Sequence, residues 1–394
     1  MKAFPKIILL FMAVDWPLYM RRQMVISMAE SAKKLGSTVV AVNRPLCPFS
    51  TYLTKRHRFS ELFGRAKLER LSDNLYRFSP KYFIYDQIAN YVPVFERFNI
   101  ALLRRSYYRL KKRLNIDESN PLIWFNYPQQ GYVARLFDKS FSVFELYDYL
   151  SDVNGEQSKS VIKLEKKLRR NVNLLVTTSS KLQASYGPNY KKSYMLGNGI
   201  DRETFLNLSD ISREIFHPIS NIQSPRLGYA GMVSDRIDWK LIHALAEREP
   251  EWNFIFVGKI QSSPAINRIA QLKNVHFPGE FSHDLVPSLL NSFDVGIMPY
   301  RVNEFFDYVN PLKFYEFAAA GLPTVSSTID ELKHHPEQFI DIIPNDPKKW
   351  HRALQSKINC DKKITKEIGV NIARNYIWED MLETLLNKIK DDYL

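Results

Sequence analysis

The stretch Tyr308–Val325, with the sequence YVNPLKFYEFAAAGLPTV, decides the fold of the second half of this 394-residue chain. Asn310 is a good helix N-cap and Pro311 a good first helical residue, so we predict a helix over Pro311–Ala320. The glycine after it ends the helix, and a short strand is expected over Pro323–Ser326. A helix that leads directly into a short apolar strand is typical of α/β proteins with a parallel sheet.

The start of this helix is also a candidate phosphate site. Backbone N–H groups in the first turn have no partner within the helix and can bind an anion. Lys313 lies in that turn, where a cation is unfavourable to the helix dipole unless an anion accompanies it. Glu316, about one turn further on, can accept hydrogen bonds from a vicinal diol such as that of ribose. The residues alone leave open an alternative, a capped helix whose Lys313 and Glu316 only face solvent.

Apolar runs alternate with amphipathic helical patterns along most of the chain, which predicts an α/β fold with parallel strands joined by crossover helices. We expect strands over Ile7–Val14, Thr38–Val42, Leu122–Asn126, Ser142–Tyr147 and Leu174–Thr178, and again over Arg226–Ala230, Asn253–Val257, Val275–Phe277 and Val295–Met298. We expect helices over Arg22–Leu35, Lys163–Arg170, Trp239–Arg248, Leu285–Ser292 and Ile364–Tyr393, and a long amphipathic one inside Arg56–Leu114. The pattern indicates two Rossmann-like halves in tandem.

Turn chemistry at Gly197-Asn198-Gly199 and the polar stretch Asn207–Ser224 mark a connection between the halves. We predict an N-terminal domain over residues 1–196, a C-terminal domain over 197–375 and a terminal helix, 376–394, that crosses back to the first domain. Ligands of such sheets bind at the carboxyl ends of the strands. The candidate site loops are therefore Val14–Arg22, Tyr147–Ser151, Ala230–Trp239, Gly258–Gln261, Gly279–Ser282 and Phe305–Pro311.

The charge balance favours an acidic partner. Lysine and arginine number 55 against 42 acidic residues, a net charge of +13, which fits a phosphorylated substrate, a nucleic acid or an anionic membrane. Cys47 and Cys360 lie far apart, and neither they nor the eight histidines show metal-ligand spacing. We therefore predict neither a disulfide framework nor a metal site, and a reducing cytosol as the compartment. The run Ile7–Val14 is too short to span a membrane and is interpreted as a buried strand.

An ordered set of motifs carries a family resemblance. It consists of Asn198-Gly-Ile-Asp201, Gly228-Tyr-Ala-Gly231, Val257-Gly-Lys259, Asn274-Val-His-Phe-Pro-Gly279, Phe293-Asp-Val-Gly-Ile-Met-Pro-Tyr300 and Asn310-Pro-x-Lys-x-x-Glu-Phe-Ala-Ala-x-Gly321. From about Leu196 to Trp378 this set resembles the nucleotide-sugar-binding domain of GT-B glycosyltransferases of group 1 (family 4-like), most of all the bacterial transferases of teichuronic-acid and exopolysaccharide assembly. The resemblance implies the GT-B fold, in which two Rossmann-like domains face each other across a cleft.

The resemblance also implies roles for the residues at matching positions. Glu316 would hold the donor ribose, and the backbone after Asn310, at Pro311, Leu312 and Lys313, would hold the distal phosphate. Gly231 would let the backbone approach the diphosphate, which Arg236 and Lys259 would neutralise, while Gly279, Glu280 and Phe281 would flank the base. Asp148 would face the donor sugar. Asp148 and Lys313 are the candidate catalytic residues.

Two positions depart from the family pattern. Tyr308 stands where the family has the first of two glutamates, and Met232 stands where it has an arginine. Retention and inversion of the sugar configuration therefore both stay open. An inverting enzyme needs a carboxylate base close to the acceptor hydroxyl, for which Asp148 and Asp152 are candidates. The alternative for both is a strand-end carboxylate that caps the next helix.

The implied reaction moves a sugar from a nucleoside diphosphate, most often UDP in the resembling family, to a lipid-linked or glycan acceptor in cell-surface polysaccharide biosynthesis. No metal or other cofactor is expected. The basic stretch Arg104–Arg113, with Tyr107 and Tyr108 interleaved, and Tyr82–Tyr91 before it predict peripheral association with the inner face of an anionic membrane. A solvated helix face is the alternative for these residues.

Other classes of protein fit less well. The chain lacks the fingerprints of RNA-recognition, KH and helix-turn-helix modules, so no nucleic-acid partner is expected. No Gly-x-Gly-x-x-Gly follows the first strand, where Ala13-Val-Asp-Trp-Pro17 stands, which argues against a dinucleotide-dependent dehydrogenase. A non-hydrolysing nucleotide-sugar epimerase and a catalytically inactive scaffold homologue remain as alternatives.

Overall fold

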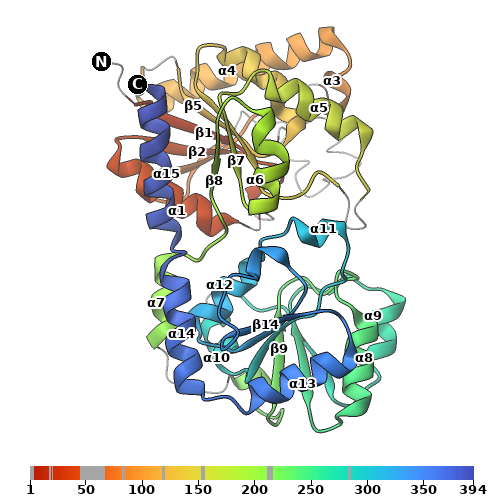
Figure 1. The fold of residues 1–394 in the computed structure, drawn as a ribbon. Coiled ribbons are helices and arrows are strands. Elements are labelled where there is room, and N and C mark those ends of the chain that lie inside the picture. Colours follow the sequence, from red (N-terminus) through yellow and green to blue (C-terminus); the bar gives the residue numbers. More distant parts are fainter. Residues whose placement is uncertain are drawn as a thin grey trace. The chain divides into compact units, whose positions relative to one another are not determined.

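The computed structural model describes residues 4–16, 19, 21–44, 67–81, 84, 86–117, 120–151, 156–210, 216–282 and 285–394. The chain forms two compact units (Figure 1). The first unit consists of Met1–Asp152, Glu156–Leu196 and Glu379–Leu394, and the second of Val153–Gly155 and Gly197–Trp378. The main division therefore falls between Leu196 and Gly197, and the last helix belongs to the first unit.

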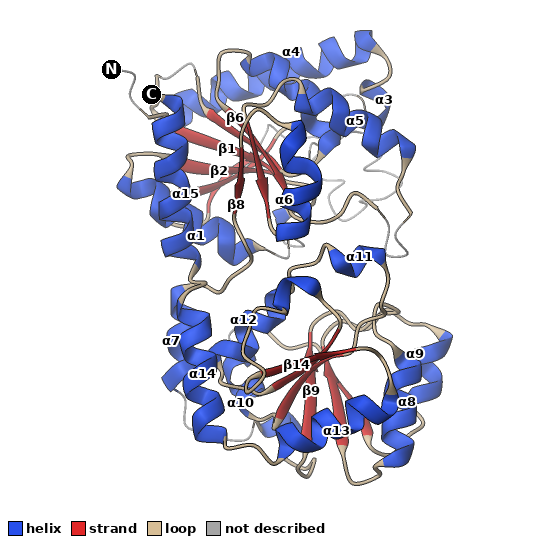
Figure 2. Ribbon diagram, in the orientation of Figure 1, coloured by secondary structure: helices blue, strands red, loops and turns tan. Residues whose placement is uncertain are grey.

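A sheet with the strand order β3-β4-β2-β1-β5-β6-β7-β8 forms the centre of the first unit (Figure 2). Its strands are β1 (Ile7–Phe11), β2 (Thr38–Val42), β3 (Lys67–Arg70), β4 (Leu75–Ser79), β5 (Leu122–Phe125), β6 (Ser142–Leu146), β7 (Leu174–Thr177) and β8 (Ser193–Met195). Neighbouring strands pair in parallel, apart from β3 and β4, which are antiparallel. The apolar runs β1, β5, β6 and β7 are buried along their whole length, as strands covered on both faces must be.

The helices of the first unit are α1 (Arg22–Lys34), α3 (Asp86–Ala89), α4 (Pro93–Leu114), α5 (Lys159–Arg169), α6 (Ser180–Tyr186) and α15 (Trp378–Tyr393), with 3-10 turns at Pro128–Phe137 and Gly187–Asn189. Helix α15 packs on α1 from the far end of the sequence (Figure 1). Ser27 Oγ donates to Glu379 Oε1 at 2.8 Å, and Ser31 Oγ donates to the Glu379 carbonyl at 3.1 Å. Lys34 forms an ion pair with Glu383 one turn later.

The sheet of the second unit has the order β11-β10-β9-β12-β13-β14, with every neighbouring pair parallel. Its strands are β9 (Arg226–Ala230), β10 (Asn253–Val257), β11 (Val275–Gly279), β12 (Val295–Met298), β13 (Thr324–Ser327) and β14 (Ile340–Ile343). The strand order reverses between β9 and β12. In open α/β sheets, ligands bind at such a switch point, outside the carboxyl ends of the strands.

The helices of the second unit form two groups on the two sides of the sheet (Figure 2). Contacts join α8 (Trp239–Arg248) to α9 (Pro264–Ile269) and α13 (Pro347–Ile358), and they join α7 (Arg202–Asp210) to α10 (Val286–Asn291), α12 (Leu312–Ala319) and α14 (Lys362–Arg374). The short helix α11 (Glu304–Asp307) and 3-10 turns at His217–Ile219 and Asp330–Leu332 complete the unit. Aspartates start three helices: Asp238, Asp346 and Asp361 each accept from a backbone N–H of the first turn.

Several predicted elements differ from the structure. The first strand ends at Phe11, not at Val14, and the helix predicted over Ile364–Tyr393 is two helices, α14 and α15. The break occurs because Ile377 pairs with Ile200 in a parallel bridge, and the Trp378 N–H donates to the Ile200 carbonyl at 2.9 Å. Strands β3, β4, β8 and β14 were not predicted, since the partly exposed residues of β3 and β8 form no apolar run.

A buried histidine packs behind α12. The His335 ring centroid lies 4.4 Å from that of Phe314 on α12 and 4.0 Å from that of His334. Burial, together with the neighbouring His334, lowers the pKa of His335 to about 4. The imidazole is therefore neutral in the folded protein over the whole range in which an unfolded histidine, with a pKa of about 6.5, takes up a proton.

We expect this histidine to make the second unit sensitive to mild acid. Between about pH 6.5 and 4 the unfolded state binds one proton more than the folded state, so the free energy of unfolding should fall by about 3 kcal/mol over that range. Urea denaturation at pH 7.0, 6.0, 5.0 and 4.5 measures this slope. His335→Phe should remove the part of the pH dependence of the free energy of unfolding that is due to His335. His243→Gln, at a less buried histidine, should leave that pH dependence unchanged. An equal acid slope in wild type and His335→Phe would contradict the assignment.

Candidate functional site

Two glycine turns lie at the carboxyl ends of the adjacent strands β9 and β10. Gly231 has a φ of 139° and Gly258 a φ of 134°, a conformation that residues with a side chain rarely adopt. A Cβ on Gly258 would lie 2.0 Å from the Gly231 carbonyl oxygen. The Gly231 N–H donates to the Val257 carbonyl, and the Gly258 N–H donates to the Gly279 carbonyl, both at 2.8 Å. The strand ends are thus held together by backbone hydrogen bonds.

Lys313 lies directly against the first of these turns. Its Nζ is 2.5 Å from the position that a Cβ on Gly231 would occupy. The ammonium group also lies over the Tyr229 ring, 4.7 Å from its centroid, and 6.0 Å from that of Tyr300. The Tyr229 hydroxyl donates to the Met232 carbonyl at 3.0 Å, which fixes the ring beneath the turn. The predicted phosphate residues Gly231 and Lys313 are therefore brought together.

The surroundings of Lys313 keep it charged. Burial opposes its charge, but the neighbouring Tyr229, Tyr300 and Glu316 raise the pKa of Lys313 above the usual value for a lysine. Burial raises the pKa of Tyr229. At neutral pH the pair is thus an ammonium ion on a neutral phenol, a cation on an aromatic face. Glu316, half-buried, lies about one turn further along α12.

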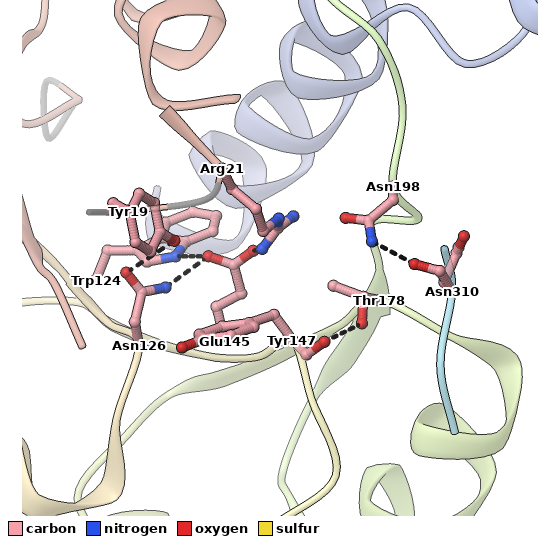
Figure 3. A network of polar contacts seen from close by, with 9 residues as sticks. All are labelled: Tyr19, Arg21, Trp124, Asn126, Glu145, Tyr147, Thr178, Asn198 and Asn310. Carbon is pink, nitrogen blue, oxygen red and sulfur yellow. Dashed lines mark hydrogen bonds and ion pairs between the residues drawn. The ribbon is translucent and has the colours of Figure 1, made fainter. Parts of the chain in front are cut away.

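The start of α12 differs from the prediction. The helix begins at Leu312, with Pro311 at the N-cap in an extended conformation, so Asn310 is not the cap. The Asn310 carbonyl accepts from Asn198 Nδ2 at 2.6 Å (Figure 3). The buried side chain of Asn310 accepts through Oδ1 from the Tyr315 hydroxyl at 2.9 Å. Its side chain is used for packing and cannot cap. Pro311 at the N-cap provides no side-chain capping hydrogen bond, and within the first turn the Phe314 N–H donates to the Pro311 carbonyl at 3.1 Å.

The remaining predicted donor residues lie in the loops that follow the strands. Arg236 is exposed and its guanidinium lies over the Phe305 ring, 5.3 Å from the centroid. Lys259 is exposed, and its carbonyl accepts from the Val233 N–H at 3.0 Å. Glu280 is exposed beyond Gly279, whereas the half-buried Phe281 packs edge-on against Phe216. The backbone of Lys259 is thus hydrogen-bonded to the loop that follows Gly231. The rings of Phe305 and Phe281 are in contact with Arg236 and Phe216, respectively.

Tyr229, Tyr300 and Asn198 were not predicted as site residues from the sequence. The first two provide the aromatic surroundings of Lys313, and the third holds the backbone before α12. All three lie inside the quoted motifs, at the end of a strand or in the Asn-Gly turn. Their positions inside the motifs pointed to these residues. A sequence pattern alone, however, does not distinguish a residue that contacts the site from one that packs in the core.

The first unit contains a pocket of about 530 Å³ at the carboxyl ends of β5 and β6, which we call the strand-end pocket. Residues that line it include Asn126, Tyr127, Tyr147, Asp148, Tyr149 and Glu156. Asp148, the candidate catalytic carboxylate, is exposed on its wall. Asp152, the other candidate, lies outside the described residues.

A buried ion pair lies behind this pocket. Glu145 on β6 is fully buried and forms an ion pair with Arg21, whose side chain is 4% exposed. The same carboxylate accepts from Trp124 Nε1 at 2.7 Å and from Asn126 Nδ2 at 2.8 Å (Figure 3). A buried charge is tolerated when it is paired and its other lone pairs are satisfied, as here. The network fixes Asn126, a residue of the pocket wall.

Two kinds of feature are absent from the parts of the chain that the structure describes. No group of three or more histidine, cysteine, aspartate or glutamate side chains there could hold a metal ion. No helix among the described residues is both long and apolar enough to cross a membrane.

Residues 224–359, which include both glycine turns and α12, match the family model "Glycosyl transferases group 1". This segment is therefore similar in sequence to the group 1 glycosyltransferases. Over 306 residues, 71% of this chain and 76% of the relative, the protein is 23% identical to Bacillus subtilis (strain 168) TuaH, whose name assigns it to teichuronic acid biosynthesis as a glycosyltransferase. The family resemblance and the enzyme class predicted from the sequence are thus confirmed.

Solved structures agree on the fold. Sucrose-phosphate synthase from Thermosynechococcus elongatus superimposes with a TM-score of 0.71 at 15% identity and covers 98% of this chain and 99% of its own. Anabaena HepE, in complex with UDP and glucose, superimposes with a TM-score of 0.65 at 16% identity over the same shares. At these identities the likeness shows the fold alone, and it confirms the predicted GT-B class of this glycosyltransferase.

We expect Gly231→Ala to weaken binding of inorganic pyrophosphate at least tenfold. The new Cβ would lie 2.5 Å from Lys313 Nζ and displace the ammonium ion from the turn. Gly36→Ala is the matched control, because Gly36 also has a positive φ, 72°, nothing lies within 4 Å of the new Cβ, and Gly36 is not a predicted donor residue. Calorimetric titration of both variants measures the difference. Equal affinities would show that Lys313 takes no part in holding the anion.

Proposed function

We propose that this chain transfers a sugar from a nucleoside-diphosphate sugar, a UDP-sugar, to a lipid-linked or glycan acceptor in cell-surface polysaccharide biosynthesis. One observation carries the donor half of the proposal. The ammonium group of Lys313 lies against the bare Gly231 turn, beside the uncapped first turn of α12. A cation, a backbone turn and helix N–H groups together suit a diphosphate.

The same groups would assist the reaction. As the sugar leaves, negative charge develops on the diphosphate, and donors already in place stabilise it without reorganisation. Lys313 and the N–H groups of α12 would supply this stabilisation, so no divalent metal is required in the proposal. Glu316 would accept hydrogen bonds from the ribose hydroxyls and hold the nucleoside end. Arg236 and Lys259, both exposed, would neutralise the remaining phosphate charge.

The comparisons support the nucleotide and the pathway class. Anabaena HepE was solved in complex with UDP and glucose, and the name of TuaH gives teichuronic acid as the polymer made. We carry over UDP as the nucleotide and a cell-surface polysaccharide as the product class. Asp148 on the wall of the strand-end pocket is the proposed group for the acceptor side. Proton NMR of the anomeric configuration in the product would decide between retention and inversion.

We further propose that helix α4 binds an anionic membrane surface on the cytoplasmic side. Its inward face is formed by Leu103, Ser106, Tyr107 and Leu110, all buried. Its outward face carries one exposed stripe, formed by Val94, Phe98, Ala101, Arg105, Tyr108 and Lys112. The stripe is apolar at its N-terminal end and basic at its C-terminal end. Such a face combines apolar insertion with attraction to anionic lipids.

The exposed fractions favour a membrane over water as the neighbour of this face. Val94 is 65% exposed and Phe98 50%, and Ile88 and Tyr91 just before the helix are 50% and 53% exposed. Arg109, Lys112 and Arg113 also line a cavity of about 350 Å³ beside β3 and β4, which could hold a phosphate headgroup. Tyr107, which was predicted to lie on this surface, is instead buried edge-on against Phe137.

We expect UDP to bind in the micromolar range, equally with magnesium and with EDTA, and more tightly than GDP, dTDP, ADP or CMP. Glu316→Ala should weaken UDP binding about 100-fold, since hydrogen bonds to a charged carboxylate contribute about 1.5–3 kcal/mol each. Lys313→Ala should mainly lower turnover, by roughly 100-fold or more. Calorimetry and a sugar-transfer assay measure the two effects.

Glu337→Ala, at an exposed carboxylate elsewhere in the second unit, is the control for Glu316→Ala. Unchanged UDP affinity in Glu316→Ala would overturn the placement of the ribose. No response to any of the five nucleotides would favour an inactive homologue.

Membrane binding has its own test. Wild type should co-sediment with vesicles that contain phosphatidylglycerol and not with pure phosphatidylcholine vesicles. Arg104→Gln, Arg105→Gln and Arg109→Gln together should weaken binding about 100-fold, because each cation near an anionic surface contributes about 1 kcal/mol. Phe98→Ser should weaken binding with no change in charge. Lys348→Gln, exposed on α13, is the control, and equal binding of all variants would contradict the assignment of α4.

A further inference from the structure

We propose that the second unit has a further anion site, which binds the phosphate group of an amphiphilic ligand, a phosphate joined to a hydrocarbon body. The site is a pocket of about 810 Å³ formed by α8, α9 and the loop after β12, which we call the α8–α9 pocket. The two helices pack against each other in the second unit (Figure 1). The proposal goes beyond the function proposed above and does not depend on it.

The α8–α9 pocket and the Lys313 turn lie on the two sides of one backbone segment. Ile237 and Tyr300 form an antiparallel bridge in this segment. Next to the bridge, the Arg301 N–H donates to the Arg236 carbonyl at 2.9 Å. The Tyr300 ring centroid lies 6.0 Å from Lys313 Nζ, whereas the following residue, Arg301, is exposed and lines the pocket. Because successive side chains of paired, extended backbone point to opposite sides, the pocket is separate from the donor turn.

Three cations from three separate elements line the pocket. They are Lys240 on α8, Arg268 on α9 and Arg301 after β12, and all three are exposed. Their side chains form no hydrogen bond or ion pair within the part of the chain that the structure describes. Like charges around one concave wall repel one another and concentrate a positive field in the cavity. An anion in the pocket would relieve this repulsion and contact cations from all three elements.

The other ionisable groups of the wall already have partners. Asp238 Oδ1 accepts from the Leu241 N–H at 3.1 Å and so caps α8, while Oδ2 accepts from Asn345 Nδ2 at 2.8 Å. His243 Nδ1 lies 3.1 Å from Glu247 Oε2, one turn further along α8. Among the described lining residues Asp238 is the one carboxylate, against three cations. The charge of the wall therefore favours an anionic ligand.

Between the charges the wall is apolar. Trp239 and Ile269 are buried, Ala265 is half-buried and Val302 is 53% exposed. The Trp239 indole N–H donates to the Ser234 carbonyl at 3.1 Å, so it is not available to a ligand. The described lining residues include no serine, threonine, asparagine, glutamine or tyrosine, the side chains that bind sugar hydroxyls without a charge.

This composition decides the class of ligand. A phosphate would contact the cations, and a hydrocarbon body would lie on the apolar wall, as at surfaces that bind amphiphiles. A volume of about 810 Å³ is within the range of small-molecule sites. The phosphate can belong to a soluble molecule or to the headgroup of a lipid in a bilayer, and the two sources share the chemistry that the pocket recognises.

Calorimetric titration of the full chain tests the proposal, with UDP at saturation to occupy the Lys313 turn. The probes are hexyl phosphate, inorganic phosphate, glucose 6-phosphate and hexanol. We expect hexyl phosphate to bind at least about tenfold more tightly than each of the others, because only this probe has both the charge and the hydrocarbon. Its affinity should persist in Lys313→Ala, which removes the cation of the donor turn. If UDP does not bind, the proposed function fails, and the titration of Lys313→Ala still tests the pocket.

Variants of the wall provide the second readout. Arg268→Gln and Arg301→Gln together should weaken hexyl phosphate binding at least about tenfold and leave UDP affinity unchanged. Arg374→Gln is the matched control, because Arg374 is exposed at the end of α14, on the other side of the sheet. Val302→Ser should weaken binding of hexyl phosphate but not of inorganic phosphate.

Two results would overturn the proposal: equal affinity for hexyl phosphate and inorganic phosphate, or hexyl phosphate binding that is lost in Lys313→Ala but kept in the double arginine variant. Sedimentation with phosphatidic acid vesicles then identifies the source of the phosphate. Weaker vesicle binding of the double arginine variant than of wild type supports a lipid headgroup in a bilayer. Equal vesicle binding, with hexyl phosphate binding lost, supports a soluble ligand at the same site.

Discussion

The second unit depends on a positive charge held where two physical effects oppose it. Lys313 lies in the first turn of α12, where the helix dipole repels a cation, and it is partly withdrawn from water. The surrounding structure compensates: Tyr229 and Tyr300 present ring faces, and Glu316 follows one turn later. The space for the ammonium group exists because Gly231 has no side chain. In the proposed function a diphosphate completes this arrangement, and Lys313 would then be held in place before the reaction to stabilise the charge that develops on the leaving group.

The first unit contains a second compensated charge, but its consequence is different. Arg21 and Glu145 are both buried, and such a pair contributes little net stability compared with apolar residues of the same size. The pair instead fixes the positions of the groups around it. Glu145 accepts from Trp124 and Asn126 as well as from Arg21, so a single carboxylate connects β5, β6 and the start of α1. The wall of the strand-end pocket is one product of that connection.

The buried strands could be predicted because a short, continuous run of apolar residues is typical of a strand that is covered on both faces in a parallel sheet. Thr38–Val42, Arg226–Ala230, Asn253–Val257 and Val295–Met298 form strands with the predicted bounds. The edge strands β3 and β8 escaped prediction because they bury little. Asn310 was misassigned as a cap because its residue type suits one, while tertiary contacts with Asn198 and Tyr315 use its polar atoms elsewhere. The partners of Lys313 needed the fold, since Tyr229, Tyr300 and Lys313 come from three separate elements.

The net charge of +13 indicates possible ligands only when the surfaces that carry the basic side chains are identified. Basic side chains gather on the outward face of α4, and single cations occur in the loops at the strand ends of the second unit. The described wall of the strand-end pocket has none. A uniformly basic protein would attract every anion to every cavity, including the diphosphate donor to the acceptor side. In the proposed function, the outward face of α4 meets an anionic membrane and the cations at the strand ends of the second unit meet a diphosphate, so the excess of lysine and arginine is divided between two surfaces with different ligands.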